Sequence, residues 1–147
     1  MNFLPSWLER LVSARARQRA VDLRIADKAK QLRRELSASF EDWPAGPNTL
    51  DELTTWAGKL GRGFAHTELH LRELVELRAD ASRHVQHAVG EARDHFYAAA
   101  DIVNGLFKGS GLSIDDDNRR EVDAKLRVAI RHVRDCLGAL DAAQRKK

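Results

Sequence analysis

The sequence predicts one all-α domain over residues 1–147, an up-and-down antiparallel bundle of three long helices and one short helix. The chain of 147 residues is 43% hydrophobic and 32% charged, with nine glycines and three prolines, a balance typical of a helical globular protein. Apolar residues return every three or four positions along most of the chain, which is the period of a buried helix face. No segment shows the strict alternation of a half-buried strand.

The first helix is predicted over residues 6–42. Ser6 and Glu9 stand three positions apart, as in a capping box at a helix start, and two prolines and a glycine between Trp43 and Asn48 stop the pattern. The expected buried stripe consists of Leu8, Leu11, Val21, Ile25, Ala29, Leu32, Leu36 and Phe40.

A short second helix is predicted over residues 49–60. Thr49 and Glu52 form a second capping-box pattern. Three glycines then follow within six residues, at Gly58, Gly61 and Gly63, and each costs about 1 kcal/mol relative to alanine inside a helix. We therefore expect a break or kink near residues 61–63, with a continuous helix from Thr49 as the alternative.

The third helix is predicted over residues 64–107, the longest uninterrupted helical pattern, and the fourth over residues 113–143. Ser113 is the expected N-cap of the fourth helix, and the acidic residues 115–117 would favour the positive end of its dipole. The apolar seam of the third helix consists of Leu71, Leu74, Ala81, Val85, Ala88, Ala92, Phe96, Ala99, Val103 and Leu106.

Composition restricts the location and the cofactors. Cys136 is the single cysteine, so the chain has no intramolecular disulfide or cysteine-based metal site, and we expect the reducing cytoplasm and no cofactor. The abundance of arginine and alanine suggests a bacterial source. There is no secretory signal pattern and no run of 18 apolar residues such as a transmembrane helix requires.

The first predicted helix is strongly basic, and the overall net charge is +3. Only Asp22 and Asp27 oppose its cations over the basic span, so the helix is a candidate for contacting a nucleic-acid backbone. The charges are spread around the helix and no aromatic residues lie between them, which argues against base-specific recognition. The candidates are Arg10, Arg15, Arg17, Arg19, Arg24, Lys28, Lys30, Arg33 and Arg34.

Histidines and acids recur at helical spacing along the third predicted helix. A solvated face with i,i+4 pairs is the main interpretation, and a pH-responsive interface is another. A divalent metal is the third, since imidazole and carboxylate groups bind zinc, although a second helix or subunit must complete the site. The stripe consists of His66, His70, Glu73, Asp80, His84, His87, Glu91 and His95, and its last run, His84, His87, Glu91 and His95, is the alternative metal set.

The first twelve residues form an apolar face that is followed by arginines. This pattern fits either a cap on one end of the bundle core or a helix lying in an anionic membrane interface, and we predict the cap. The residues are Phe3, Leu4, Trp7, Leu8, Leu11 and Val12.

Two Arg–His pairs have a spacing used by a known class of nuclease. Arg127 and His132 are separated by four residues, and Arg78 and His84 by five. This spacing in a small helical protein resembles the HEPN-type ribonucleases. The resemblance implies a metal-independent ribonuclease in which Arg127 and His132 are catalytic and two subunits converge on one phosphate.

These observations favour binding over catalysis. The sequence contains no phosphate-binding glycine loop, GxSxG elbow, HExxH motif or paired ExxH motif. We predict a non-enzymatic interaction or assembly subunit of a bacterial complex, with a protein partner or a second copy and no small-molecule substrate. Nucleic-acid contact is a secondary expectation, and the HEPN-like ribonuclease and a peripheral membrane module are the alternatives.

Overall fold

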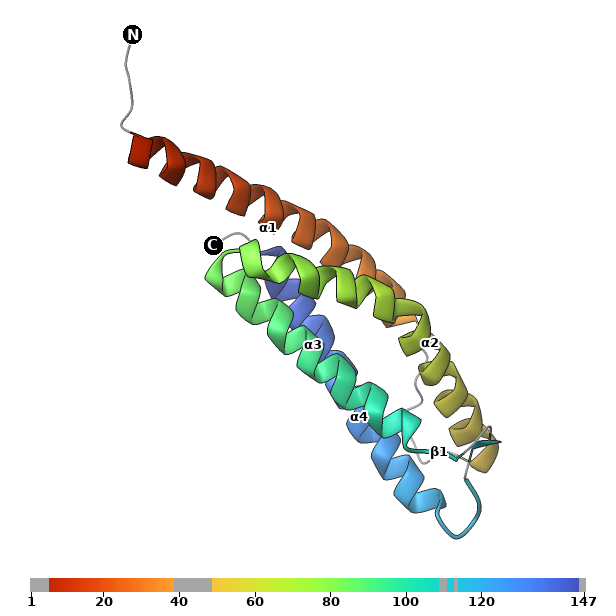
Figure 1. Cartoon of the computed structure of the whole chain (residues 1–147). Helices are drawn as coiled ribbons and strands as arrows, with labels where there is room; N and C mark the ends of the chain where they lie inside the picture. Colours follow the sequence, from red (N-terminus) through yellow and green to blue (C-terminus); the bar gives the residue numbers. More distant parts are fainter. Residues whose placement is uncertain (1–5, 39–48, 109–110, 113, 146–147) are drawn as a thin grey trace.

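The computed structural model is an all-α bundle, as predicted (Figure 1). It describes residues 6–38, 49–108, 111–112 and 114–145. A 3₁₀ turn, η1 (Arg78–Asp80), joins the second and third helices, and a two-residue strand β1 (Phe107–Lys108) pairs antiparallel with β2 (Gly111–Leu112). The helices are α1 (Ser6–Ala38), α2 (Leu50–Leu77), α3 (Arg83–Asn104) and α4 (Arg119–Gln144).

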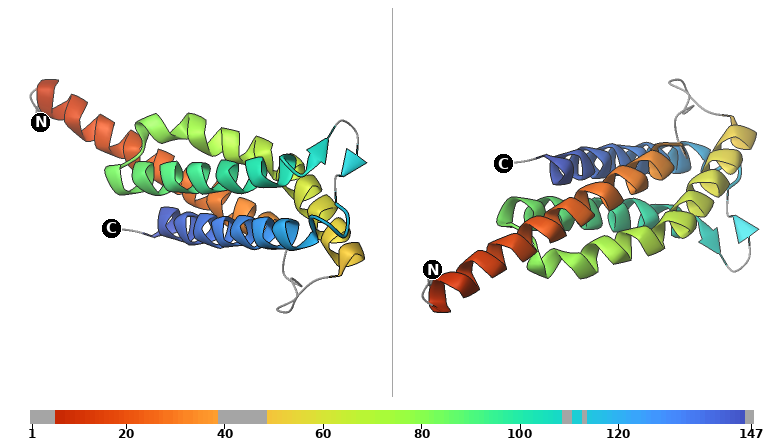
Figure 2. Two further views of the ribbon diagram at one scale, coloured as in Figure 1. Left: turned by 90° about the horizontal axis from the view of Figure 1, so that it is seen from below. Right: turned by 90° about the horizontal axis from the view of Figure 1, so that it is seen from above.

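The helices follow one another around the bundle in chain order. Each packs against the next, and α4 closes the bundle by packing against α1. Helices α3 and α4 lie side by side along most of their length (Figures 1 and 2). The core contains every apolar position predicted for the third helix and, from α1, Ile25, Ala29, Leu32 and Leu36. Phe40 lies outside the described residues.

Helix α2 does not stop at residue 60, so the predicted short helix is wrong and the continuous alternative is correct. Its start is confirmed: Glu52 N donates to Thr49 Oγ1 at 3.2 Å, and Thr49 N donates to Glu52 Oε1 at 3.3 Å. The helix changes direction along its course (Figures 1 and 2). The Thr67 hydroxyl donates to the Gly63 carbonyl at 2.7 Å, a back-bond that bends helices.

The predicted helix over residues 64–107 is two antiparallel helices. The α-helix ends at Leu77, the chain passes through η1, and α3 begins at Arg83 after Ser82 in extended conformation. The apolar seam conceals this reversal because Leu74 and Ala81 are both buried on either side of it. Within the described part of the chain, the bundle therefore has four long helices, of 33, 28, 22 and 26 residues, in place of three long ones and a short one.

Side chains from two helices hold the α2–α3 turn. Arg78 Nε donates to the Gln86 carbonyl at 2.8 Å, and Gln86 Nε2 donates to the Ala81 carbonyl at 2.9 Å. From α1, Asp22 Oδ1 accepts a hydrogen bond from Ser82 N at 2.9 Å. The bonds to the Ala81 carbonyl and from Ser82 N satisfy backbone groups that lie in the break between the two helices, and the bond from Arg78 ties the turn to the first turn of α3.

Helix α4 begins later than predicted. It starts at Arg119, and Ser113, the predicted N-cap, lies outside the described residues. Asp115 Oδ1 accepts from Asp117 N and from Asn118 N, both at 3.0 Å. Asn118 Oδ1 in return accepts from Asp115 N at 2.8 Å. The acidic residues therefore form a turn ahead of the helix, because their side chains bond the local backbone.

Replacing Gly90 by alanine should destabilise the α2–α3 turn. A Cβ on Gly90 would lie 2.7 Å from Arg78 Nη2, so the guanidinium must shift, and we expect this shift to disrupt the hydrogen bond that Arg78 Nε donates to the Gln86 carbonyl. We expect Gly90→Ala to be less stable than Gly138→Ala by about 1.5–3 kcal/mol in urea unfolding, the range for a charged hydrogen bond.

Gly138→Ala is the matched control, because nothing lies within 4 Å of its added Cβ. It should stabilise the protein by up to about 1 kcal/mol through helix propensity. In an Arg78→Ala background, Gly90→Ala and Gly138→Ala should change the free energy of unfolding equally. Equal effects in the unmodified background would contradict the prediction, because they would show that displacing the Arg78 guanidinium does not change the free energy of unfolding.

Candidate interaction surface and histidine cluster

The first part of α1 projects beyond the bundle. We call residues 6–20 the arm. Leu8 is half-buried and all the other residues of the arm are exposed. The first fully buried residue of α1 is Ile25. The exposed fractions of Trp7, Leu11 and Val12 are 64%, 43% and 54%. Figures 1 and 2 show the start of α1 extending past the other helices. The predicted cap on the bundle core is therefore wrong for these three residues, while Phe3 and Leu4 lie outside the described residues.

The arm continues the face with which α1 packs into the bundle. Moving back from Ile25 in steps of four and three residues leads to Val21, Gln18, Ala14, Leu11 and Trp7. Residues at this spacing lie on one side of a helix. Val21 is still packed against the core, and beyond it the same face is uncovered. We call these five positions the arm seam.

Two grooves flank the base of the arm. One, of about 430 Å³, lies between α1 and η1 and is lined by Ala14, Arg17, Gln18, Ala20, Val21, Arg24 and Asp80. The other, of about 490 Å³, lies between α1 and the adjacent ends of α3 and α4, and its lining includes Leu23, Ala26, His84, Val85 and Ala143. The base of the arm therefore offers partly apolar recesses next to the uncovered seam.

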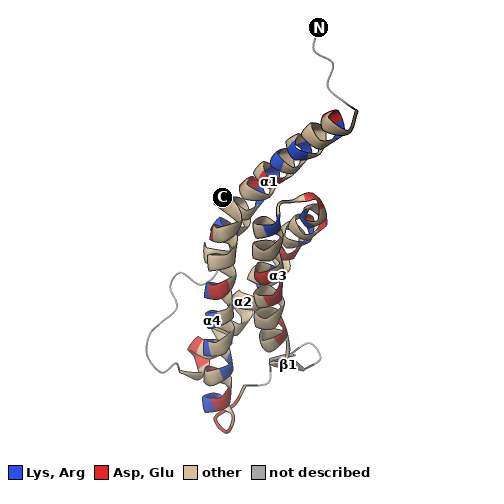
Figure 3. Ribbon diagram, turned by 90° about the vertical axis from the view of Figure 1, so that its left-hand side faces the viewer, with Lys and Arg blue, Asp and Glu red and all other residues tan. Residues whose placement is uncertain are grey.

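The basic residues of α1 divide into two groups. Lys28 Nζ lies 2.6 Å from Glu73 Oε2, and Arg33 Nε lies 2.6 Å from Asp141 Oδ1, so these two join α1 to α2 and to α4. The hydrogen bond from Lys28, together with its charge, lowers the pKa of Glu73. The remaining candidates are exposed, and Figure 3 shows Lys and Arg along the arm. They are Arg10, Arg15, Arg17, Arg19, Arg24, Lys30 and Arg34.

The two predicted Arg–His pairs have other partners. Arg127 Nε donates to Asp123 Oδ2 at 3.0 Å, and His132 faces a histidine of α3. In the second pair, Arg78 supports the α2–α3 turn, and His84 lies within hydrogen-bond distance of Ser82 Oγ and of the Arg145 carbonyl. The ribonuclease interpretation stays a prediction.

The histidine stripe is divided between helices. His70 Nε2 lies 3.2 Å from Glu35 Oε2 of α1, and His87 Nε2 lies 3.1 Å from Glu91 Oε1. His66 is exposed. The structure does not gather the alternative metal set, His84, His87, Glu91 and His95, into one group; of these four, only His95 belongs to a metal-sized cluster among the described residues.

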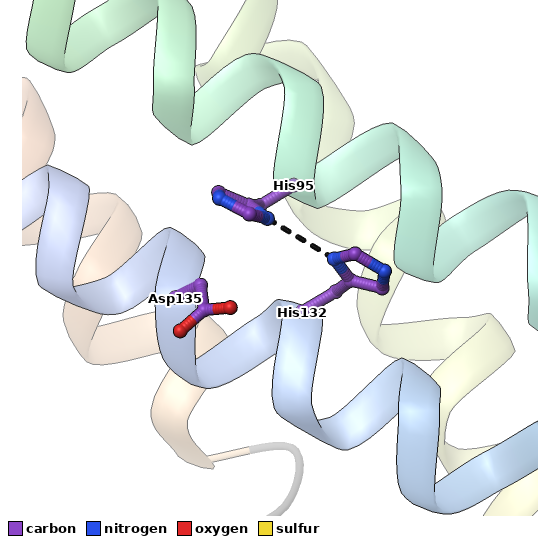
Figure 4. A group of neighbouring side chains, drawn as sticks. All are labelled: His95, His132 and Asp135. Carbon is purple, nitrogen blue, oxygen red and sulfur yellow. Dashed lines mark hydrogen bonds between the residues drawn. The ribbon is translucent and has the colours of Figure 1, made fainter.

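That cluster joins α3 to α4. His95 Nδ1 lies 3.0 Å from His132 Nδ1, with ring centroids 5.3 Å apart, and Asp135 follows one turn along α4 (Figure 4). One ligand atom from each residue lies within 4.8 Å of the others. Sequence reasoning singled out both histidines separately and missed Asp135. The signal available was His132 and Asp135 at i,i+3, which places them on one face of α4.

No significant match emerges from comparison with protein-family models, with curated proteins or with solved structures. None of the described helices combines the length and apolar character needed to cross a bilayer. Function must therefore be inferred from the arm and from the histidine cluster.

Cys136 is predicted to be unreactive in the folded protein. Its side chain is fully buried, and burial raises the pKa of the thiol to about 12. The reactive thiolate is therefore scarce and shielded. A thiol reagent such as DTNB should react only after unfolding, whereas a cysteine introduced by Ala16→Cys on the exposed arm should react at once. Reaction of native Cys136 at the rate of the exposed cysteine would contradict its burial.

Proposed function

We propose that this protein is a non-enzymatic assembly subunit that associates with a second copy through its α1 arm. The observation that carries the proposal is the uncovered continuation of a packing face. Trp7 and Leu11 stand at positions whose equivalents further along α1, Ile25 and Ala29, are fully buried. Burial of large apolar side chains of this kind stabilises an association by about 1.5–3 kcal/mol each. The bacterial cytoplasm, inferred from the single cysteine and the composition, is the proposed location.

The character of the arm seam favours a helix as the occupant. Its alternating steps of four and three residues match the narrow stripe of paired helices. Gln18 lies within the stripe, and single polar seam residues specify register in coiled coils. A helix lying in a membrane interface presents a broader apolar face, and a nucleic-acid backbone would leave Trp7 and Leu11 uncovered.

The seam matches itself in an antiparallel pair centred on Ala14. In an antiparallel pair centred on residue 14, the residue numbers of two facing positions add to about 28. Trp7 of one copy therefore lies opposite Val21 of the other, and Leu11 lies near Gln18. Ala14 then faces its own equivalent, and its small side chain allows close approach.

The groove beside η1 complements this register. It lies next to Val21, where the indole of Trp7 from the second copy would arrive, and it contains Asp80. A carboxylate there provides an acceptor for the indole N–H, which usually finds a partner when it is buried.

Like charges oppose the same association. The arm carries Arg10, Arg15, Arg17 and Arg19 against Glu9 alone. Salt screens repulsion between exposed charges, so pairing of two arms should strengthen as salt increases. Binding of an anionic partner would show the opposite dependence.

Cysteine cross-linking tests the register. Ala14→Cys should form a disulfide-linked dimer under mild oxidation because the two thiols meet at the axis. Ala16→Cys, an exposed position about 200° around the helix from Ala14, is the matched control and should remain monomeric. Native Cys136 is buried and should not participate. Equal cross-linking at the two positions would indicate random collision and would contradict the proposed pairing.

Sedimentation equilibrium tests the apolar contact itself. Leu11→Glu should weaken dimerisation at least tenfold, since it places a charge in the apolar seam, while Leu69→Glu, at an exposed leucine of α2, should not. A protein that stays monomeric at high salt and high concentration would overturn the proposal. Flotation with anionic vesicles that Leu11→Glu abolishes would then favour the peripheral membrane module.

A second candidate function, contact with a nucleic-acid backbone, is favoured by one specific arrangement. Arg10, Arg17 and Arg24 are exposed and follow one another at intervals of seven residues, which places them in a row about 20 Å long on one side of α1. Such a row can track phosphates without reading bases.

Fluorescence anisotropy with labelled duplex DNA and RNA tests this second candidate. Affinity should fall steeply with salt, and replacing the three arginines of the row by alanine should reduce the slope of log affinity on log salt by up to about 0.9 for each phosphate that the variant no longer neutralises. The matched control replaces three exposed arginines elsewhere, Arg83, Arg131 and Arg134. An unchanged slope after removal of the row, or no binding at low salt, would eliminate this candidate.

A further inference from the structure

We propose that His95, His132 and Asp135 form a binding site for one divalent transition-metal ion, with zinc as the test ion, between α3 and α4. The inference is independent of the arm, which belongs to another part of the molecule.

The two imidazole rings approach each other through their nitrogens. The two Nδ1 atoms are 3.0 Å apart, so their lone pairs cannot both be left facing each other. Either one nitrogen carries a proton and donates it to the other, or both nitrogens bind a common ion. Tetrahedral zinc with bonds of about 2.0–2.1 Å places two ligand nitrogens about 3.4 Å apart. The observed separation is a few tenths of an ångström shorter, so the two rings must move apart slightly and turn until both nitrogen lone pairs point at one ion.

The third ligand is already close. Asp135 contributes a carboxylate oxygen that lies within 4.8 Å of one ring nitrogen of each histidine, and it stands three residues after His132 on the same face of α4. Asp135 is exposed, so its side chain is free to rotate toward an ion. Its negative charge also offsets part of the charge that a dication would bring.

The surroundings suit a site with an open coordination position. Both histidines are half-buried and Asp135 is exposed, so the site faces solvent on one side. Three protein ligands with solvent access leave a position for water or for a ligand atom from another molecule. Two imidazoles and a carboxylate favour zinc, copper, nickel or iron over calcium and magnesium, which prefer all-oxygen sites.

The neighbouring sulfur does not belong to this site. Cys136 follows Asp135 in the chain but is fully buried in the core. Arg131 and Arg134 are exposed sequence neighbours of the ligands on α4. Asp135 is the one acidic residue among the three members of the cluster. Loss of that carboxylate should therefore lower the affinity for the metal ion strongly.

Titration calorimetry with zinc tests the proposal on untagged, chelator-treated protein near neutral pH. We expect one ion per chain. His95→Gln, His132→Gln and Asp135→Asn should each lower the affinity at least 10–100-fold, since even loss of an outer-shell partner has an effect of that size. His66→Gln and His87→Gln, at exposed histidines outside the cluster, are the matched controls and should leave the affinity unchanged.

Two further readouts make the test specific. Cobalt bound at the same site should show the intense visible absorption of a low-coordinate N/O complex, and the three ligand variants should lose it. Zinc affinity should decrease as the pH is lowered, because ligand nitrogens must be free of protons to bind the ion. Circular dichroism of each variant checks that the bundle is intact.

The opposite results would overturn the inference. If zinc does not bind, or if His132→Gln and His95→Gln bind it as tightly as the unmodified chain, the two rings share a proton and not an ion. Binding that disappears only in His87→Gln would assign the ion to the exposed His87–Glu91 pair.

Discussion

A helix buries its apolar face only along the length over which other helices lie beside it, and this constraint decides most of the architecture. Helix α1 has 33 residues and α3 has 22, which correspond to about 50 Å and about 33 Å. The first helix is too long for the bundle that it enters. Its packing face consequently continues into solvent as the arm seam, and the surface that we propose for association results from a mismatch in length.

The turn between α2 and α3 sets that mismatch. It ends both helices beside the base of the arm, where Asp22 of α1 accepts the hydrogen bond from Ser82 N and Asp80 lines the groove. Arg78 fits against α3 only because Gly90 has no side chain. A few polar contacts thus decide where α1 stops being covered.

The same close packing gives the histidine cluster its geometry. Helices α3 and α4 lie along each other, and ligands from two helices can approach an ion from two directions, whereas adjacent ligands on one helix cannot. The i,i+4 contact between His87 and Glu91 is exposed to solvent. His95 differs from His87 because His132 of α4 lies opposite it.

The sequence by itself determined the helical class, the buried seam over residues 71–106 and the start of α2 at Thr49, because helical period and capping are local properties of the chain. The break at residues 78–82 escaped prediction because the seam keeps its register across it. Arg78 at a seam position, followed by Ser82, was the available signal. Only the tertiary structure decided that the turn is held by Asp22, 60 residues away, that Trp7 is uncovered, and that His95 meets His132. Each of these depends on which helices lie side by side and how far they extend, and no local pattern encodes that.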